Sequence, residues 1–254
     1  MRGRQGSVVP TIRGGPTART LFLVGGLFLF ALGIVLMVQA GLGLSPWDVL
    51  NQGVAEHTPL SFGAANIAIS VAVVALAWRL GARIGPGTVA NAILIGVFVD
   101  LLLRLGVVSD LSNAGLASRT LMLAGGIGLI GLATPLYIGA GMGAGPRDSL
   151  MLSLTRRTRG RVGIVRTFLE ATVTVIGFSL GGTVGIGTLA FAFGIGPAVE
   201  ASFALLARSA LAVPASGSDR GQRLEAASAE RAETGNAPPL ATDDAEMPVS
   251  CVRV

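Results

Sequence analysis

Six long apolar stretches, separated by short polar or glycine-rich segments, dominate the chain between residues 19 and 208. Each stretch has close to the ~20 residues that an α-helix needs to cross the hydrocarbon core of a bilayer. The pattern therefore predicts an all-α integral membrane protein. Its six transmembrane helices are expected at Arg19–Val38, Phe62–Leu80, Gly87–Val107, Arg119–Ile138, Val162–Leu180 and Gly187–Arg208.

The pattern repeats itself after 100 residues. Aligning residues 20–106 with residues 120–206 gives 28 identities in 87 pairs without a gap, and "GLGLSPWDVL" (41–50) falls on "GMGAGPRDSL" (141–150). Each unit carries three predicted spans, an odd number, so the second unit must enter the membrane from the opposite side. The sequence thus predicts two inverted three-helix repeats, 19–107 and 119–208, related by a pseudo-two-fold axis in the membrane plane.

The basic residues predict the orientation. All 19 are arginines, and placing the N-terminus in the cytoplasm puts 17 of them on the cytoplasmic side, leaving only Arg104 and Arg119 outside. We therefore expect a bacterial inner-membrane protein with both termini cytoplasmic and a basic arm at 1–18. The basic N-terminus also fits a signal peptide, but its apolar run is too long and has a counterpart at 120–140, so we expect it to be retained.

The net charge of +5 gives no reason to expect a nucleic-acid partner. The arginines lie in the short loops between spans, where the membrane topology alone accounts for them. The tail at 214–254 holds seven acids and four arginines, with few large apolar residues. That composition predicts disorder.

The repeated phrase predicts a helix start in each half. Ser45 or Gly145 serves as N-cap, Pro46 or Pro146 occupies the first turn, and the following aspartate completes a capping box. The helices that follow, at about 46–56 and 146–157, are too short to span a bilayer, and glycine-rich breaks precede both. Broken helices at equivalent positions of two inverted halves indicate a transporter binding site.

Polar residues within the spans also correspond between the halves. Arg166 and Glu170 lie four residues apart on one helix face, and their counterparts are Asn66 and Ser70; Asp100 likewise corresponds to Glu200. One interpretation is adhesion between helices through hydrogen bonds. The other is a polar path between the repeats, lined by these four residues, with Asp48 and Asp148 at its mouths. Three aromatic residues are expected at the membrane interfaces: Trp47, Trp78 and Tyr137.

No pattern predicts catalysis, a metal site or a cofactor. His57 is the only histidine and Cys251 the only cysteine, and "GAGMGAG" (139–145) lacks the preceding strand that a dinucleotide-binding fingerprint requires. An enzyme is therefore the least favoured class. Two classes stay open: a small-solute transporter or channel, and an accessory protein that anchors an enzyme or secretion partner. The arginine-rich loop Arg156–Arg161 could dock that partner or anionic lipid.

Four phrases carry a family resemblance: "GLGLSPWDVL", "GMGAGPRDSL", "RTFLE" (166–170) and "GGTVGIGTLAFAFGIGP" (181–197). Together they resemble the YczE-like bacterial integral membrane proteins, which are related to the YitT group. The resemblance covers residues 20 to 208. It implies a multi-span inner-membrane protein and supplies no catalytic residues.

Overall fold

The computed structural model describes residues 11–12, 15–158, 162–209 and 212–213. All of them belong to one contact unit, Met1–Pro214. The predicted disorder of the tail at 214–254 lies outside the described residues, as does most of the basic arm. The elements of the described part are β1 (Thr11–Ile12), α1 (Pro16–Ala40), α2 (Pro46–His57), α3 (Phe62–Arg79), α4 (Pro86–Arg104), α5 (Leu116–Gly139), α6 (Pro146–Thr158), α7 (Val162–Ser179), α8 (Ile186–Arg208) and β2 (Ala212–Val213).

The prediction of an all-α membrane protein with six spans is confirmed. Six helices, α1, α3, α4, α5, α7 and α8, are long and apolar enough to cross a membrane, and their ends lie within a few residues of the predicted ones. The two short helices expected after the first span of each half are α2 and α6. Within the described residues, the only strands are the two-residue pair β1 and β2, which run antiparallel.

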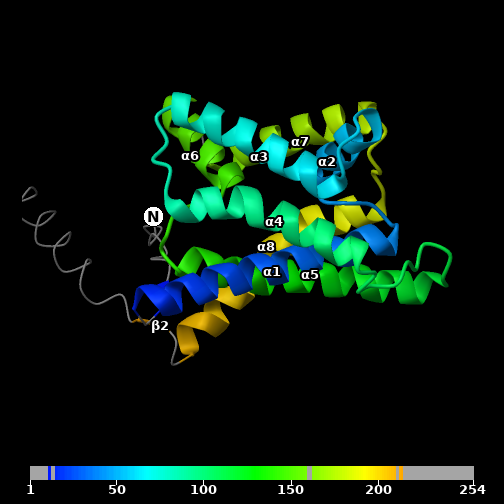
Figure 1. Cartoon of the computed structure of the whole chain (residues 1–254), viewed down its shortest axis with the longest axis horizontal. Helices are drawn as coiled ribbons and strands as arrows, with labels where there is room; N and C mark the ends of the chain where they lie inside the picture. Colours follow the sequence, from blue (N-terminus) through cyan, green and yellow to red (C-terminus); the bar gives the residue numbers. More distant parts are fainter. Residues whose placement is uncertain (1–10, 13–14, 159–161, 210–211, 214–254) are drawn as a thin grey trace, which may run out of the picture. The chain divides into compact units, whose positions relative to one another are not determined.

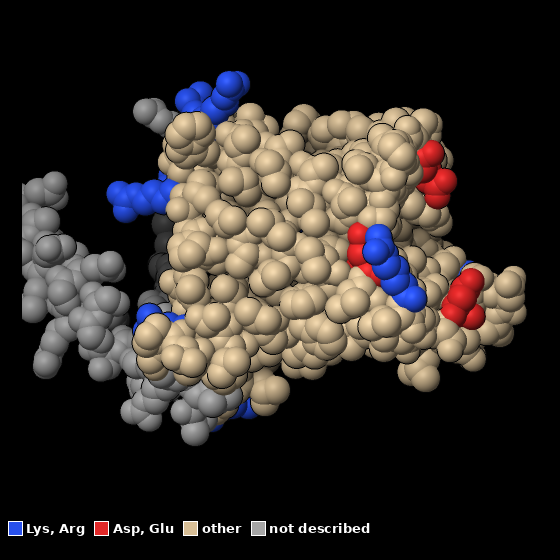
Figure 2. Space-filling view, in the orientation of Figure 1, with Lys and Arg blue, Asp and Glu red and all other residues tan. Residues whose placement is uncertain are grey.

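The outer surface is that of a protein embedded in lipid. Figure 2 shows charged side chains only toward the two ends of the visible face, with an uncharged belt between them. Large apolar side chains are exposed on the spans, including Trp78 at 68%, Phe168 at 72% and Phe193 at 80%. Burying such a surface against acyl chains removes it from water, so the chain is a multi-pass membrane protein in contact with the bilayer.

The helices α1 and α5 cross closely at matching glycines. A methyl group added at Gly26 would lie 2.9 Å from the Tyr137 backbone nitrogen, and one added at Gly126 would lie 2.9 Å from the Met37 side chain. Residues 26 and 126 are repeat counterparts, and so are 37 and 137. The first spans of the two halves therefore pack against each other reciprocally.

The halves also exchange contacts at their loops and short helices. The Gly87 N–H of α4 donates to the Met142 carbonyl at 2.8 Å, and the Gly187 N–H of α8 donates to the Leu42 carbonyl, also at 2.8 Å. In the same way α2 packs on α7, and α6 packs on α3. A two-fold relation between the halves would produce such reciprocal pairs. Their opposite orientation across a membrane stays a prediction.

The short helices α2 and α6 meet at their N-terminal ends. The Arg147 guanidinium, in the first turn of α6, lies 5.2 Å from the ring centre of Trp47, in the first turn of α2. Figure 1 shows the two helices at opposite ends of one layer, beside α3 and α7. Each is about 18–20 Å long at 1.5 Å per residue, roughly half of a span plus its headgroups. Each is therefore too short to cross a bilayer, as the sequence predicts.

Candidate functional site

The start of α2 is a sealed polar cluster. Ser45 is the N-cap, and its Oγ accepts from the Asp48 backbone N–H at 3.4 Å. The predicted return bond from Asp48 to the Ser45 backbone is replaced by a bond from the Ser45 hydroxyl to the Asp48 carboxylate. The Asn51 amide donates to the same carboxylate at 3.1 Å, and Arg147 lies 3.8 Å from it. Asp48 is thus 2% exposed and fully engaged.

The start of α6 has the same backbone hydrogen bond, but its aspartate has different partners. Pro146 begins the helix, and the Ser149 N–H donates to the Gly145 carbonyl at 2.9 Å, as the Val49 N–H does to Ser45. With glycine in place of serine, Asp148 has no hydroxyl beside it at the N-cap. Its carboxylate instead interacts with the Tyr137 hydroxyl and with the guanidinium groups of Arg147 and Arg166. The two repeated aspartates therefore have different surroundings.

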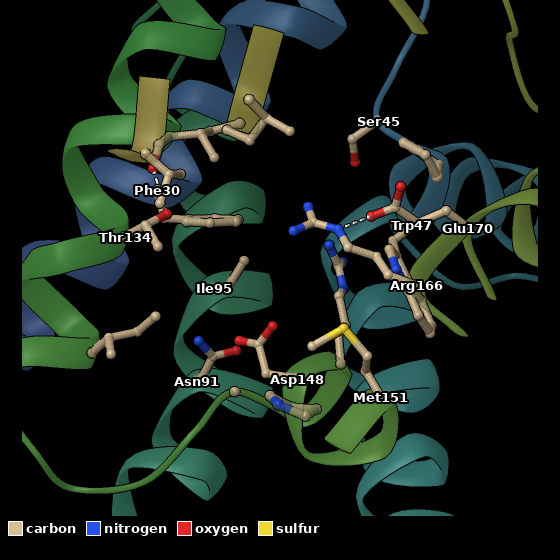
Figure 3. A pocket seen from close by; sticks show the side chains of 18 of the residues that line it. Phe30, Ser45, Trp47, Asn91, Ile95, Thr134, Asp148, Met151, Arg166 and Glu170 are labelled. Carbon is tan, nitrogen blue, oxygen red and sulfur yellow. Dashed lines mark hydrogen bonds and ion pairs between the residues drawn. The ribbon is translucent and has the colours of Figure 1, made fainter. Parts of the chain in front are cut away.

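A cavity of about 400 Å³ lies where α2 and α6 meet. Both helix starts line it, together with residues of α1, α3, α4, α5, α7 and α8, so both halves contribute to its wall. Figure 3 shows Arg166 reaching toward the middle of the cavity, paired with Glu170, and Asp148 beside Asn91. The volume falls within the range of pockets that hold small molecules.

Five of the six predicted path residues line this cavity: Asn66, Ser70, Asp148, Arg166 and Glu170. The sixth, Asp48, does not, since its carboxylate is held inside the α2 cluster. The Arg166 Nε donates to the Glu170 carboxylate at 2.9 Å, so the expected i,i+4 pair forms. Asn66 and Ser70, its counterparts, are 2% and 7% exposed.

The sequence analysis did not predict several of the residues that line the cavity. The interface role expected of Trp47 and Tyr137 is wrong, because both are buried and line the cavity; only Trp78 is exposed. Arg147, Asn91 and Glu200 also line it. A signal for Arg147 was present in the sequence, because it replaces Trp47 in the repeated phrase at a helix start.

The wall carries both signs of charge. Arg147 and Arg166 face Asp148, Glu170 and Glu200 around a largely apolar lining that includes Phe30 and Ile95. The first turns of α2 and α6 add the positive ends of two helix dipoles. Among the described residues, no group of three or more His, Cys, Asp or Glu side chains is placed to hold a metal ion. The arrangement can bind and orient a small polar solute.

Comparison with known proteins places the chain among membrane proteins. Residues 17–203 match the model of a family described as "Family of unknown function (DUF6198)". An uncharacterized protein of Haemophilus influenzae is 39% identical over 188 residues, covering 72% of this chain and 84% of that protein. The uncharacterized membrane protein YczE of Bacillus subtilis is 34% identical over 177 residues, covering 67% and 79%.

The resemblance to YczE-like proteins is therefore confirmed. A second Bacillus subtilis protein, the uncharacterized YyaS, is 30% identical over 166 residues, covering 65% of this chain and 82% of that protein. No solved structure matches the chain.

Proposed function

The chain belongs to the DUF6198 family, and we propose that it is a non-enzymatic small-solute transporter or channel of the bacterial inner membrane. Both termini face the cytoplasm in this proposal. The observation that supports it is the cavity itself: the starts of α2 and α6 and the polar pairs of both halves converge on one space of about 400 Å³.

The charged pair Arg166 and Glu170 on the cavity wall supports a role in binding a solute and not only in adhesion between helices. A charged side chain in a bilayer costs several kcal/mol unless a partner or a water-filled cavity compensates for it. Arg166 and Glu170 pair with each other, yet their side chains keep 50% and 26% of their exposure. Pure adhesion would bury such side chains against another helix.

The test is the thermal stability of the purified protein in detergent with a panel of inorganic ions, amino acids, sugars and organic anions. A solute at 100 times its Kd stabilises the folded state by roughly 2.7 kcal/mol, which raises the melting temperature measurably. Glu170→Gln should abolish that rise. Glu56→Gln is the matched control, since Glu56 is exposed and lies outside the cavity.

A rise that survives in Glu170→Gln would place the solute elsewhere, and no rise from any solute would contradict the proposal. The alternative, an accessory protein that docks a partner or anionic lipid at Arg156–Arg161, then gains weight. Two of its arginines, Arg156 and Arg157, are exposed in the last turn of α6. Under that alternative, the double substitution Arg156→Gln and Arg157→Gln would weaken binding of the partner or of anionic lipid, whereas Glu170→Gln would leave that binding unchanged.

A further inference from the structure

The two halves differ at one seam, although the residues of that seam repeat. In the first half, α3 packs along α4 through Gly63 and Gly96; a methyl group added at Gly63 would lie 2.1 Å from the Gly96 carbonyl oxygen. Asp100 of α4 locks the seam by accepting from the Gly63 N–H at 2.8 Å and from the Ser61 hydroxyl. This seam is closed.

The second half carries Gly163, Gly196 and Glu200 at the equivalent positions, but its seam is open. A methyl group added at Gly163 or at Gly196 would meet no described atom within 4 Å. No substantial contact joins α7 to α8. Glu200, the counterpart of Asp100, is exposed and lines the cavity instead of capping a helix.

The difference in exposure between the two seams is clearest at the start of α7. The C-terminal half of α7 is buried against α2 instead of α8: Val173 is 7% exposed, and a methyl group added at Gly177 would lie 2.5 Å from the Leu50 backbone nitrogen. The N-terminal half of α7 is not held. Position 163 is exposed where position 63 is buried, and position 166 is exposed where position 66 is buried. The gap therefore opens the cavity between the start of α7 and the end of α8.

We propose that this opening is a gate, and that the structure is one of two conformations which exchange the packing of the two seams. In the other conformation α7 closes on α8 through Gly163 and Gly196, with Glu200 capping α7, while α3 separates from α4. Each half then adopts the packing that its counterpart has here.

The role of the gate in moving a solute rests on the proposed transport function. The side of the membrane to which it opens follows from the predicted topology. By the arginine distribution, the start of α7 and the end of α8 face the cytoplasm, and the closed α3–α4 seam faces outward. The structure is then the inward-open state. A charge at both seams also gives each closed state its own lock, Asp100 outside and Glu200 inside.

The test measures distances between spin labels in a Cys251→Ser background. One pair sits at Phe168 and Leu205 across the open seam; the matched pair sits at Ala68 and Leu105 across the closed seam. All four positions are exposed. We expect two distances for each pair, one for each conformation. Gly196→Leu should remove the shorter α7–α8 distance and the longer α3–α4 distance, since its side chain fits only the open seam.

Gly128→Leu is the control, because an added methyl group there also meets nothing within 4 Å and Gly128 lies on α5, which forms neither seam. It should leave all distances unchanged. A single α7–α8 distance that Gly196→Leu does not alter overturns the gate. If the spin labels show two distances but no solute raises the melting temperature, the gate is supported and the transport function is rejected. If a solute raises the melting temperature but each label pair shows a single distance, the transport function is supported and the gate is rejected.

Discussion

Substitution by alanine should affect stability differently at the adjacent glycines Gly25 and Gly26 of α1. A methyl group at Gly26 would lie 2.9 Å from the Tyr137 backbone nitrogen and 3.2 Å from the Leu136 side chain, whereas one at Gly25 would meet nothing within 4 Å. Both sites gain up to about 1 kcal/mol of helix propensity on changing to alanine. Only Gly26→Ala also forces α5 away, which typically costs about 1–3 kcal/mol.

The propensity gain cancels when the two variants are compared, so Gly26→Ala should be less stable than Gly25→Ala by about 1–3 kcal/mol. Reversible unfolding by SDS in mixed micelles, followed by circular dichroism, measures the difference. The second half offers a replicate, because Gly125 is open while Gly126 faces Met37 and the Gly33 carbonyl. Equal stabilities of the two variants in both halves would refute the reciprocal crossing of α1 and α5.

Three further predictions concern other contacts between the halves and the topology. Thr88→Val should lower the free energy of unfolding by about 1 kcal/mol, because the Thr88 hydroxyl donates to the Ala144 carbonyl at 2.6 Å, and Thr88→Ser should restore it in the same assay. Arg119→Gln should cost about 1–3 kcal/mol by removing charge-assisted bonds to the carbonyls of Ala40 and Gly41 at 2.9 and 2.6 Å, whereas Arg104→Gln, on an exposed arginine, should cost almost nothing. In a Cys251→Ser background, a membrane-impermeant maleimide added to intact cells should label Asn113→Cys and spare Arg83→Cys; the opposite result would reverse the topology.

The fold was predictable because long apolar segments identify membrane spans from the sequence alone. A run of about 20 apolar residues has one stable solution in lipid, so the six spans and the two broken helices followed from the sequence. The 100-residue offset further paired positions such as Asn66 with Arg166, and both line the cavity. Local patterns of this kind do not depend on how the helices pack.

Packing between distant segments was not predictable. Trp47 looked like an interface aromatic, and nothing local to it shows that Arg147, exactly one repeat away, covers its ring. Asp48 and Asp148 look alike in the sequence, but Ser45 bonds to the carboxylate of Asp48, whereas Asp148 follows a glycine and lines the cavity. The open α7–α8 seam was equally hidden, because its glycines and acid match those of the closed seam.

The exchanged bonds between the loop of one half and the last helix of the other bear on the origin of the chain. Leu42 accepts from Gly187 just as Met142 accepts from Gly87. Two separate copies of one three-helix ancestor, inserted in opposite orientations, could exchange the same bonds without any covalent link. The arrangement is therefore compatible with an ancestral dual-topology dimer that assembled first, with gene fusion later fixing each copy's orientation and freeing Trp47 and Arg147 to diverge.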